Sequence, residues 1–210
     1  MEPGVMLSAK SLRFFGFAMP LLTAGFWVGL IGWWTLGFTA FTATSHTFNL
    51  AGPLPRQAAS LALVNHQGHF FSLIQPNGPY RLVYFHFLSC RQICPLLHSR
   101  HLEILRSLPP VKQANLELLA ISVDPADTPD NLWAHLRHLD SPPNLVMAAL
   151  DGPQPQSLQA LGVSVVRKAD GSYNHPAFSF LINPQGKMVL VVDGNTPPAQ
   201  AARRIEKELP

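Results

Sequence analysis

The longest hydrophobic stretch of the chain lies close to its N-terminus. Residues 14–45 include no charged side chain, and the first part of this run, 14–41, is strongly apolar. A helix needs about 20 apolar residues to cross a bilayer. The apolar region of a cleaved signal peptide usually spans only about 7–15 residues. We therefore predict a retained transmembrane anchor at 14–41, with a cleaved signal peptide as the alternative.

The charges beside this run predict its orientation. Lys10 and Arg13 lie in a short head, residues 1–13, that precedes the run. Lysine and arginine are enriched on the cytoplasmic side of membrane spans. We therefore expect a single-pass protein of the bacterial inner membrane, with a cytoplasmic N-terminus and its globular part on the periplasmic side.

After a polar, proline-containing linker at 42–57, short apolar runs alternate with amphipathic segments up to the C-terminus. Strands are predicted where branched and aromatic residues lie between turn residues, and helices where apolar residues recur three and four positions apart. The predicted strands are 61–64, 70–74, 81–87, 116–123, 145–150, 178–182 and 187–192. The predicted helices begin near Pro95, run from Pro129 to about Leu139, and cover 156–161 and 198–209.

This order of elements predicts the fold. A strand, helix, strand, helix and strand followed by a hairpin and a closing helix is the thioredoxin-like order. We therefore predict an α/β, thioredoxin-like domain at 58–210, extended at its N-terminal end by the hairpin 61–74.

The composition changes this picture little but limits the function classes. A chain of 210 residues and 23.1 kDa has room for one domain and an appendage. The net charge of +3 is mild and its cations are scattered, so no nucleic-acid partner is expected. The chain has only two cysteines, which do not establish its redox compartment.

Both cysteines lie between the strand 81–87 and the helix that follows it. Cys90 and Cys94 are about one helical turn apart if the loop curls into that helix, so they can close a disulfide or hold one soft metal ion. A helix start also lowers the pKa of a thiol. Zinc normally takes four protein ligands, whereas Cu(I) prefers sulfur and accepts fewer. The alternatives are a buried structural disulfide or two unrelated thiols.

Three segments carry a resemblance to a known family. Cys90–Pro95 has the frame C-x3-C-P, Ile121–Asp130 reads ISVDPADTPD, and 174–187 places Asn-His before FSFLI and a Gly-Lys turn. Together they resemble the Sco/SenC family of membrane-anchored copper proteins, which assist assembly of the dinuclear copper centre of cytochrome c oxidase. The resemblance implies a thioredoxin-like fold and a copper site whose ligands are Cys90, Cys94 and His175.

The chain departs from the family pattern close to these cysteines. The family usually has Thr at the position of Leu88, Pro-Asp at Arg91-Gln92, a small or Thr-like residue at His86 and Asp at Asn174. The substitutions remove acidic groups and add one cation. Arg91 is expected to stabilise a thiolate at Cys90 and to strengthen its redox chemistry.

Other polar residues near the motifs have structural explanations. His86 is expected to be either a core histidine or a neighbour of Cys90. His98 and His101 form a helical i, i+3 pair that could bind a metal, but His101 shares its row with leucines and favours a buried structural role. The remaining expectations are that Trp133 is core, that Asp124 and Asp127 are turn and cap residues, and that four histidines are solvated: His66, His69, His135 and His138.

The resemblance implies a Cu(I) metallochaperone, with Cu(II) as a second oxidation state to consider. Its partner would be the copper-centre subunit of a respiratory oxidase. The alternative is an extracytoplasmic thiol-disulfide oxidoreductase, in which Cys90 and Cys94 are the redox-active pair and a thiol-disulfide reductase is the electron donor. A redox or copper sensor is a third hypothesis. Ligand exchange would need His175, whereas thiol exchange would need only the cysteines.

Overall fold

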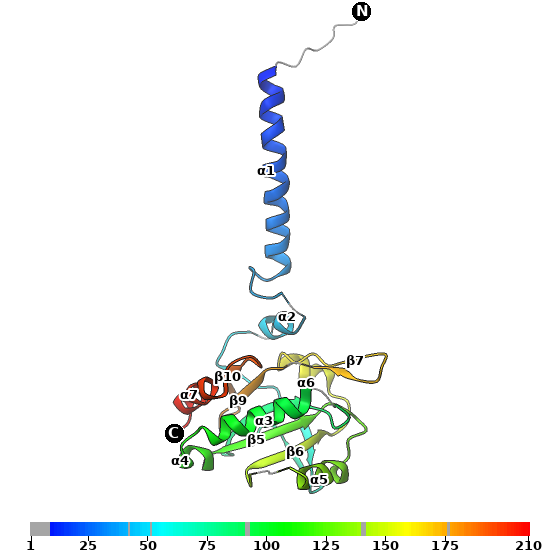
Figure 1. The fold of residues 1–210 in the computed structure, drawn as a ribbon, viewed down its shortest axis with the longest axis vertical. Coiled ribbons are helices and arrows are strands. Elements are labelled where there is room, and N and C mark those ends of the chain that lie inside the picture. Colours follow the sequence, from blue (N-terminus) through cyan, green and yellow to red (C-terminus); the bar gives the residue numbers. More distant parts are fainter. Residues whose placement is uncertain (1–8, 42, 51, 91–92, 140–141, 176) are drawn as a thin grey trace, which may run out of the picture. The chain divides into compact units, whose positions relative to one another are not determined.

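The computed structural model describes residues 9–41, 43–50, 52–90, 93–139, 142–175 and 177–210 (Figure 1). The chain forms two compact units, Met1–His46 and Thr47–Pro210. In the first unit, α1 (Ala9–Trp34) ends in a turn where the Thr35 hydroxyl donates to the Ile31 carbonyl, 2.6 Å away.

The predicted anchor, 14–41, falls in this first unit. Its side chains at 14–18 lie outside the described part of the chain. Within the described residues, no helix combines the length and the apolar character that a membrane span requires.

The segment predicted as a linker, 42–57, contains regular structure. It holds α2 (Ala43–Leu50) and β1 (Arg56–Gln57), which pairs antiparallel with β10 (Lys187–Val192). The Arg56 guanidinium lies 4.4 Å from the ring centroid of Phe48 and donates to the Leu161 carbonyl at 3.2 Å. The pairing with β10 and the bond to Leu161 join residues far apart in sequence, so the local hydrophobic pattern gave no sign of them.

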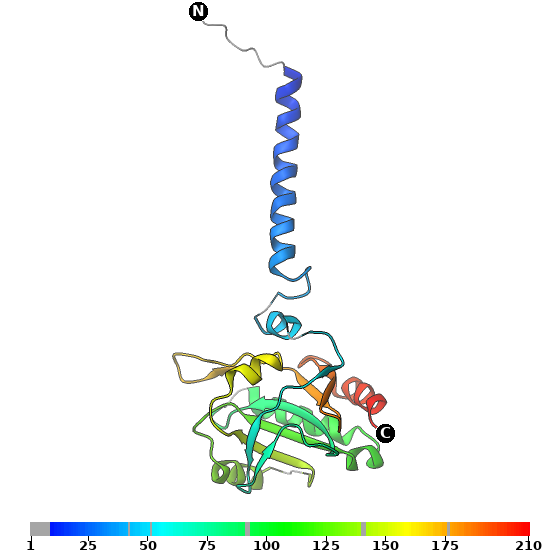
Figure 2. The same ribbon diagram turned by 180° about the vertical axis from the view of Figure 1, so that it is seen from behind.

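The second unit is built on an eight-stranded sheet with the strand order β1-β10-β9-β4-β5-β6-β2-β3. The three central strands β4, β5 and β6 are parallel, and the remaining pairs are antiparallel. The strands not yet given bounds are β2 (Ala62–Asn65), β3 (Phe70–Ser72), β4 (Tyr80–His86), β5 (Leu116–Ser122), β6 (Leu145–Leu150) and β9 (Ser179–Ile182). The predicted N-terminal hairpin is therefore β2–β3, which extends the sheet beyond β6; its cyan strands are seen from behind in Figure 2.

Helices cover both faces of this sheet. Because successive side chains of a strand point to opposite faces, Leu82 and Tyr84 of β4 belong to one core cluster, and Val83 and Phe85 to another. The first cluster packs under α3 (Ile93–Arg106), α5 (Pro129–Arg137) and α7 (Pro198–Glu208), and the second under α6 (Pro155–Ala160) and the β2–β3 hairpin. The mixed α/β class predicted from the sequence is confirmed.

Two short features were not predicted. They are α4 (Pro110–Ala114) and the two-stranded pair β7 (Val166–Arg167) and β8 (Tyr173–Asn174). A strand of two residues is too short to show an alternating pattern.

The sheet places the two cysteines at the end of a central strand. β4 ends at His86 and α3 begins at Ile93, so the connection between them leaves the carboxyl end of a parallel strand. Ligand sites of parallel α/β sheets characteristically lie at this edge.

Candidate metal centre

The two thiols meet at the first turn of α3. The backbone N–H of Cys94 donates to the sulfur of Cys90, with nitrogen and Sγ 3.3 Å apart. Both residues are thiols rather than a disulfide. Cys94 is buried and Cys90 is half-buried, so Cys90 is the more accessible sulfur. The predicted juxtaposition of the two cysteines is therefore present.

His175 reaches the same point from a distant part of the chain. Its Nε2 lies 3.9 Å from Cys94 Sγ, although 81 residues separate the two. The Phe87 ring meets the imidazole edge-on, with centroids 5.8 Å apart and planes at 90°. For metal–sulfur and metal–nitrogen bonds of about 2.3 and 2.0–2.1 Å, an angle of about 120° at the metal separates S and N by about 3.8 Å. The observed distance fits a shared ion.

Cys90, Cys94 and His175 are neighbours, but their donor atoms do not yet surround one point. In the described part of the chain, no group of three His, Cys, Asp or Glu side chains is already arranged to hold a metal ion. Cys94 is the common neighbour of Cys90 and His175. Bringing all three to one ion therefore requires side-chain rotation around Cys94, and the donor set of two sulfurs and one imidazole suits a soft ion such as Cu(I).

The environment of Cys94 opposes the sequence-based expectation of a lowered thiol pKa. Burial, followed by the hydrogen bond with Cys90, raises the pKa of the Cys94 thiol to about 12. Removal from water disfavours the charged thiolate and is the largest cause of the shift. Cys94 is therefore a thiol near neutral pH unless a metal ion replaces its proton.

A buried carboxylate holds the loop that carries Cys90. Asp127 Oδ2 accepts hydrogen bonds from the Leu88 backbone N–H at 2.9 Å and from the Ser122 hydroxyl at 2.5 Å. Asp124 accepts from the Ala126 N–H at 3.0 Å, as expected of a turn residue. Asp127 is thus a positioning residue for the loop, a role that the ISVDPADTPD segment alone did not reveal.

Asp124 also acts on the site through an aromatic neighbour. Its Oδ1 accepts a hydrogen bond from the Tyr173 hydroxyl at 3.3 Å, and the Tyr173 ring packs edge-on against Phe87 with centroids 5.4 Å apart. Phe87 in turn contacts His175. The carboxylate therefore supports the wall of aromatic rings beside the imidazole.

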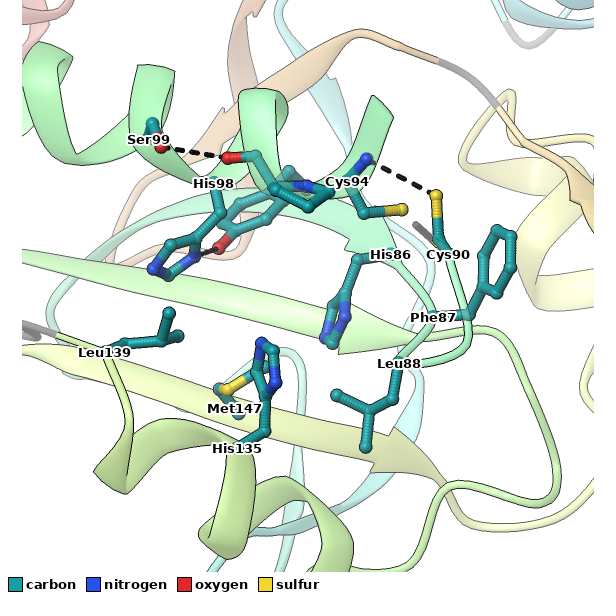
Figure 3. Close-up of a pocket in the computed structure, with 12 residues that line it drawn as sticks. His86, Phe87, Leu88, Cys90, Cys94, His98, Ser99, His135, Leu139 and Met147 are labelled. Carbon is teal, nitrogen blue, oxygen red and sulfur yellow. Dashed lines mark hydrogen bonds between the residues drawn. The ribbon is translucent and has the colours of Figure 1, made fainter. Parts of the chain in front are cut away.

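A cavity of about 140 Å³ lies on the inner side of the cysteine pair (Figure 3). Its lining includes both cysteines and side chains from four elements, His86 of β4, His98 of α3, His135 of α5 and Met147 of β6. His86 is buried, as expected of a core histidine, and it lines the same cavity as Cys90. His135 is exposed, as predicted, although its side chain also borders this cavity.

The predictions for the other histidines and for Trp133 are confirmed in some cases and wrong in others. His101 is buried and stacks on Tyr84, with ring centroids 4.0 Å apart, so its predicted structural role is confirmed. Trp133 was predicted as core but is 43% exposed, because it stacks on half-buried His66 at the surface. Exposed His69 agrees with its prediction.

Arg91 and Gln92 lie outside the described residues. The expectation that Arg91 stabilises a Cys90 thiolate is therefore a prediction from the sequence.

Comparison with known proteins identifies a family and a fold. A family model described as SCO1/SenC matches residues 54–210. A Stutzerimonas stutzeri protein named "Putative copper-binding protein" is 30% identical over 143 residues, which cover 64% of this chain and 69% of that protein.

Solved structures share the fold at lower identity. The crystal structure of Arabidopsis thaliana ScoI with copper bound is 19% identical, with a TM-score of 0.62 over 73% of this chain and 98% of that one. BsSco is 23% identical, with a TM-score of 0.59 over 74% of this chain and 95% of that one. Its structure was described in identifying a disulfide switch in a member of the Sco family of cytochrome c oxidase assembly proteins.

Proposed function

The chain belongs to the SCO1/SenC family, and on that basis we propose that it is a metallochaperone that binds Cu(I) through Cys90, Cys94 and His175. It donates this ion by ligand exchange to the copper-centre subunit of a respiratory oxidase. One observation carries the proposal. The His175 imidazole, 81 residues away in sequence, lies 3.9 Å from the sulfur of a C-x3-C pair.

The charge of the site supports a monovalent, soft ion. Two thiolates and a neutral imidazole bring a charge of −2, so bound Cu(I) leaves a net charge of −1. The metal replaces the proton that Cys94 otherwise keeps, which couples copper binding to proton release. A thiolate on a partner can then attack the three-coordinate ion and take it over, with no electron transferred.

The relatives support copper as the cargo. The Arabidopsis thaliana structure contains copper, and the Stutzerimonas stutzeri relative is named for copper binding. BsSco is described as a member of a family of cytochrome c oxidase assembly proteins. These descriptions support an oxidase as the destination of the ion.

Titration of the reduced protein with Cu(I) tests the proposal. The wild type should hold one tight equivalent, and Cys90→Ser or Cys94→Ser should each abolish it. His175→Ala should weaken it by more than about 10-fold, or about 1.4 kcal/mol. His69→Ala, at an exposed histidine, is the control and should bind as the wild type does. Wild-type binding by all three site variants would contradict the proposal.

A second candidate function is thiol-disulfide exchange, which the unequal burial of the cysteines favours. Cys90 is the more accessible sulfur and would attack a partner disulfide, while buried Cys94 would resolve the mixed disulfide. Both electrons come from the dithiol, which a thiol-disulfide reductase restores. His175→Ala separates the two functions, because it should impair copper binding and leave thiol exchange intact.

We also propose that residues 14–41 anchor the protein in the inner membrane, with the unit from Thr47 onward in the periplasm. The proposal is supported by the uncharged run and by Lys10 and Arg13, which precede it. An extracytoplasmic location suits a protein whose cysteines cycle between dithiol and disulfide.

A further inference from the structure

The cavity behind the cysteine pair is lined by groups that the three-ligand site does not use. Of the twelve residues that line it, three are histidines, His86, His98 and His135, and one is a buried methionine, Met147. The twelve include no carboxylate. A cavity with imidazole and thioether groups and no acidic group suits a soft ion such as Cu(I) better than Mg²⁺ or Ca²⁺.

His86 presents an available nitrogen inside the fold. The residue is only 5% exposed, and its Nε2 is a buried atom with no hydrogen-bond partner in the described part of the chain. A hydrogen bond to the Ala120 backbone engages the ring, and burial lowers its pKa to about 3. His86 is therefore neutral near pH 7. A backbone contact at one ring nitrogen with the other left for the metal is the usual arrangement of a histidine ligand.

His135 and Met147 lie beside this nitrogen. Figure 3 shows the His86 and His135 rings next to each other, with the Met147 side chain adjoining His135. Among the neighbouring charges, that of His135 lowers the pKa of His86 most, which agrees with their closeness. The Nδ1 of His98 is paired with the Tyr84 hydroxyl, 2.8 Å away, and its Nε2 is likewise buried without a partner in the described residues. In Figure 3, however, the His98 ring lies apart from the rings of His86 and His135. The converging pair is therefore His86 and His135.

We propose that His86, His135 and Met147 form a second Cu(I) site on the inner side of the cysteine pair. Within the described residues no third His, Cys, Asp or Glu side chain is grouped with His86 and His135 around one point. The thioether of Met147 lines the same cavity and adjoins His135 in Figure 3, so Met147 is the third donor of the proposed site. Two imidazoles and a thioether are neutral donors that Cu(I) accepts. The inference rests on the proposed copper function for the source of the ion.

The second site should be weaker than the first. A cation held by neutral ligands in a buried cavity loses hydration without gaining a compensating charge. The negative charge that could stabilise this cation is that of the first site, which carries a net charge of −1 when it holds copper. Its two sulfur ligands, Cys90 and Cys94, line the same cavity. The dithiolate site should therefore fill first and favour the second ion.

The competing occupant of the cavity is water. A volume of about 140 Å³ is large enough for several water molecules, and water could satisfy His86 Nε2 as well as a metal could. Removing the thioether distinguishes the occupants, because Met147→Leu preserves the approximate volume and the apolar character of the side chain.

Cu(I) added to the reduced full-length chain, labelled with ¹³C at the methionine methyl groups, tests the inference. Thiolate-to-copper absorption follows the first equivalent, and the Met147 resonance follows the second. The chain has five methionines, of which Met188 is fully buried in the other core cluster and serves as an internal control. We expect two bound equivalents, with the Met147 resonance moving during the second and that of Met188 unmoved.

Variants separate this inference from the proposed function. Met147→Leu and His135→Gln should each weaken the second equivalent at least 10-fold and leave the first unchanged. His138→Gln, on the exposed side near the end of α5, should change neither. If the wild type stops at one equivalent with the Met147 resonance unmoved, the second site does not exist. If the thiolate absorption itself fails to develop, the proposed function fails instead.

Discussion

The carboxylate of Asp127 accepts a hydrogen bond from the backbone N–H of Leu88, with Oδ2 and nitrogen 2.9 Å apart. The bond joins the start of α5 to the loop that leads from β4 to the cysteines. The same oxygen accepts from Ser122 at the end of β5, so neighbouring strands share one acceptor. The position of Cys90 thus depends on a residue that touches neither sulfur.

Asp127→Ala should therefore weaken both stability and copper binding. It leaves the Leu88 N–H and the Ser122 hydroxyl without their acceptor, which costs about 1–3 kcal/mol for a buried donor. Asp127→Asn retains one carbonyl oxygen and should lose less. Urea unfolding and Cu(I) titration measure the two effects. Asp130→Ala, at an exposed acid in the first turn of α5, is the control, and an equal effect of the two alanine variants would contradict the positioning role.

Cys94 should be slow to alkylate near neutral pH. Its pKa is raised to about 12, mainly by burial, whereas an ordinary cysteine titrates near 8.5. Because only the thiolate reacts, the rate of Cys94 in a Cys90→Ser variant should be at least 10-fold below that of the urea-unfolded chain at pH 8. The rate should still increase above pH 10. A plateau between about pH 8 and 9 would show that burial does not control this thiol.

His101 should make the protein sensitive to acid. Burial lowers the pKa of its imidazole from 6.5 to about 4. The unfolded chain binds a proton below about pH 6.5, but the folded chain does so only near pH 4. The corresponding stability is present above pH 6.5 and is lost as the pH falls from about 6.5 to 4.

Urea unfolding at several pH values between 7 and 4 tests this linkage. His101→Leu should reduce the loss of unfolding free energy in acid, and the remainder should come from His86 and His98, whose pKa values are also lowered by burial. His69→Gln, at an exposed site, should retain the wild-type dependence. If the His101 variant loses as much stability in acid as the wild type, the linkage argument is wrong.

The elements that could be predicted from the sequence were those whose runs of apolar residues are long enough to indicate a strand or a helix. The runs of branched, aromatic and other apolar residues at 81–87 and 116–123 predicted β4 and β5, which are seven residues long and almost wholly buried. The spacing of Cys90 and Cys94 then placed both sulfurs at the first turn of α3. Local rules were sufficient for these features.

The parts that could not be predicted depend on tertiary contacts. His175 was found through family resemblance, because nothing in its local sequence indicates a sulfur 81 residues away. The exposure of Trp133, and the contact of the exposed His135 with the cavity, went unrecognised, because the nine residues of α5 do not reveal which face is covered. Likewise, the helix-start argument for Cys94 omitted burial, which raises the pKa of this thiol.

Full-length protein should resist extraction from membranes with carbonate. The prediction rests on the uncharged run that follows Arg13, and on Lys10 and Arg13 as the residues that orient it. A periplasm-specific reporter fused after Pro210 should be active. Replacing Lys10 and Arg13 with glutamine should reduce that activity, while Lys207→Gln should not. A cytoplasmic reporter signal, or release of a shortened soluble form, would overturn the topology.

The last prediction concerns Arg91, whose side chain lies outside the described residues and whose effect can be measured directly. The raised pKa of Cys94 leaves Cys90 as the only cysteine that could be a thiolate near neutral pH. A guanidinium on the adjacent residue favours that thiolate. In a Cys94→Ser background, Arg91→Gln should therefore raise the pKa of Cys90 and slow its alkylation at pH 7, while Arg91→Lys should retain most of the rate.

The same cation should affect the redox potential, because it stabilises the thiolate of the reduced form more than the neutral disulfide. With both cysteines present, Arg91→Gln should make the disulfide easier to form, measured by equilibration with glutathione. Copper binding should change less than in His175→Ala, because Arg91 supplies no ligand. Rates and potentials that match the wild type would mean that the Arg91 guanidinium points into solvent. The thiol-exchange function would then lose its electrostatic support, and copper binding would still rest on Cys90, Cys94 and His175.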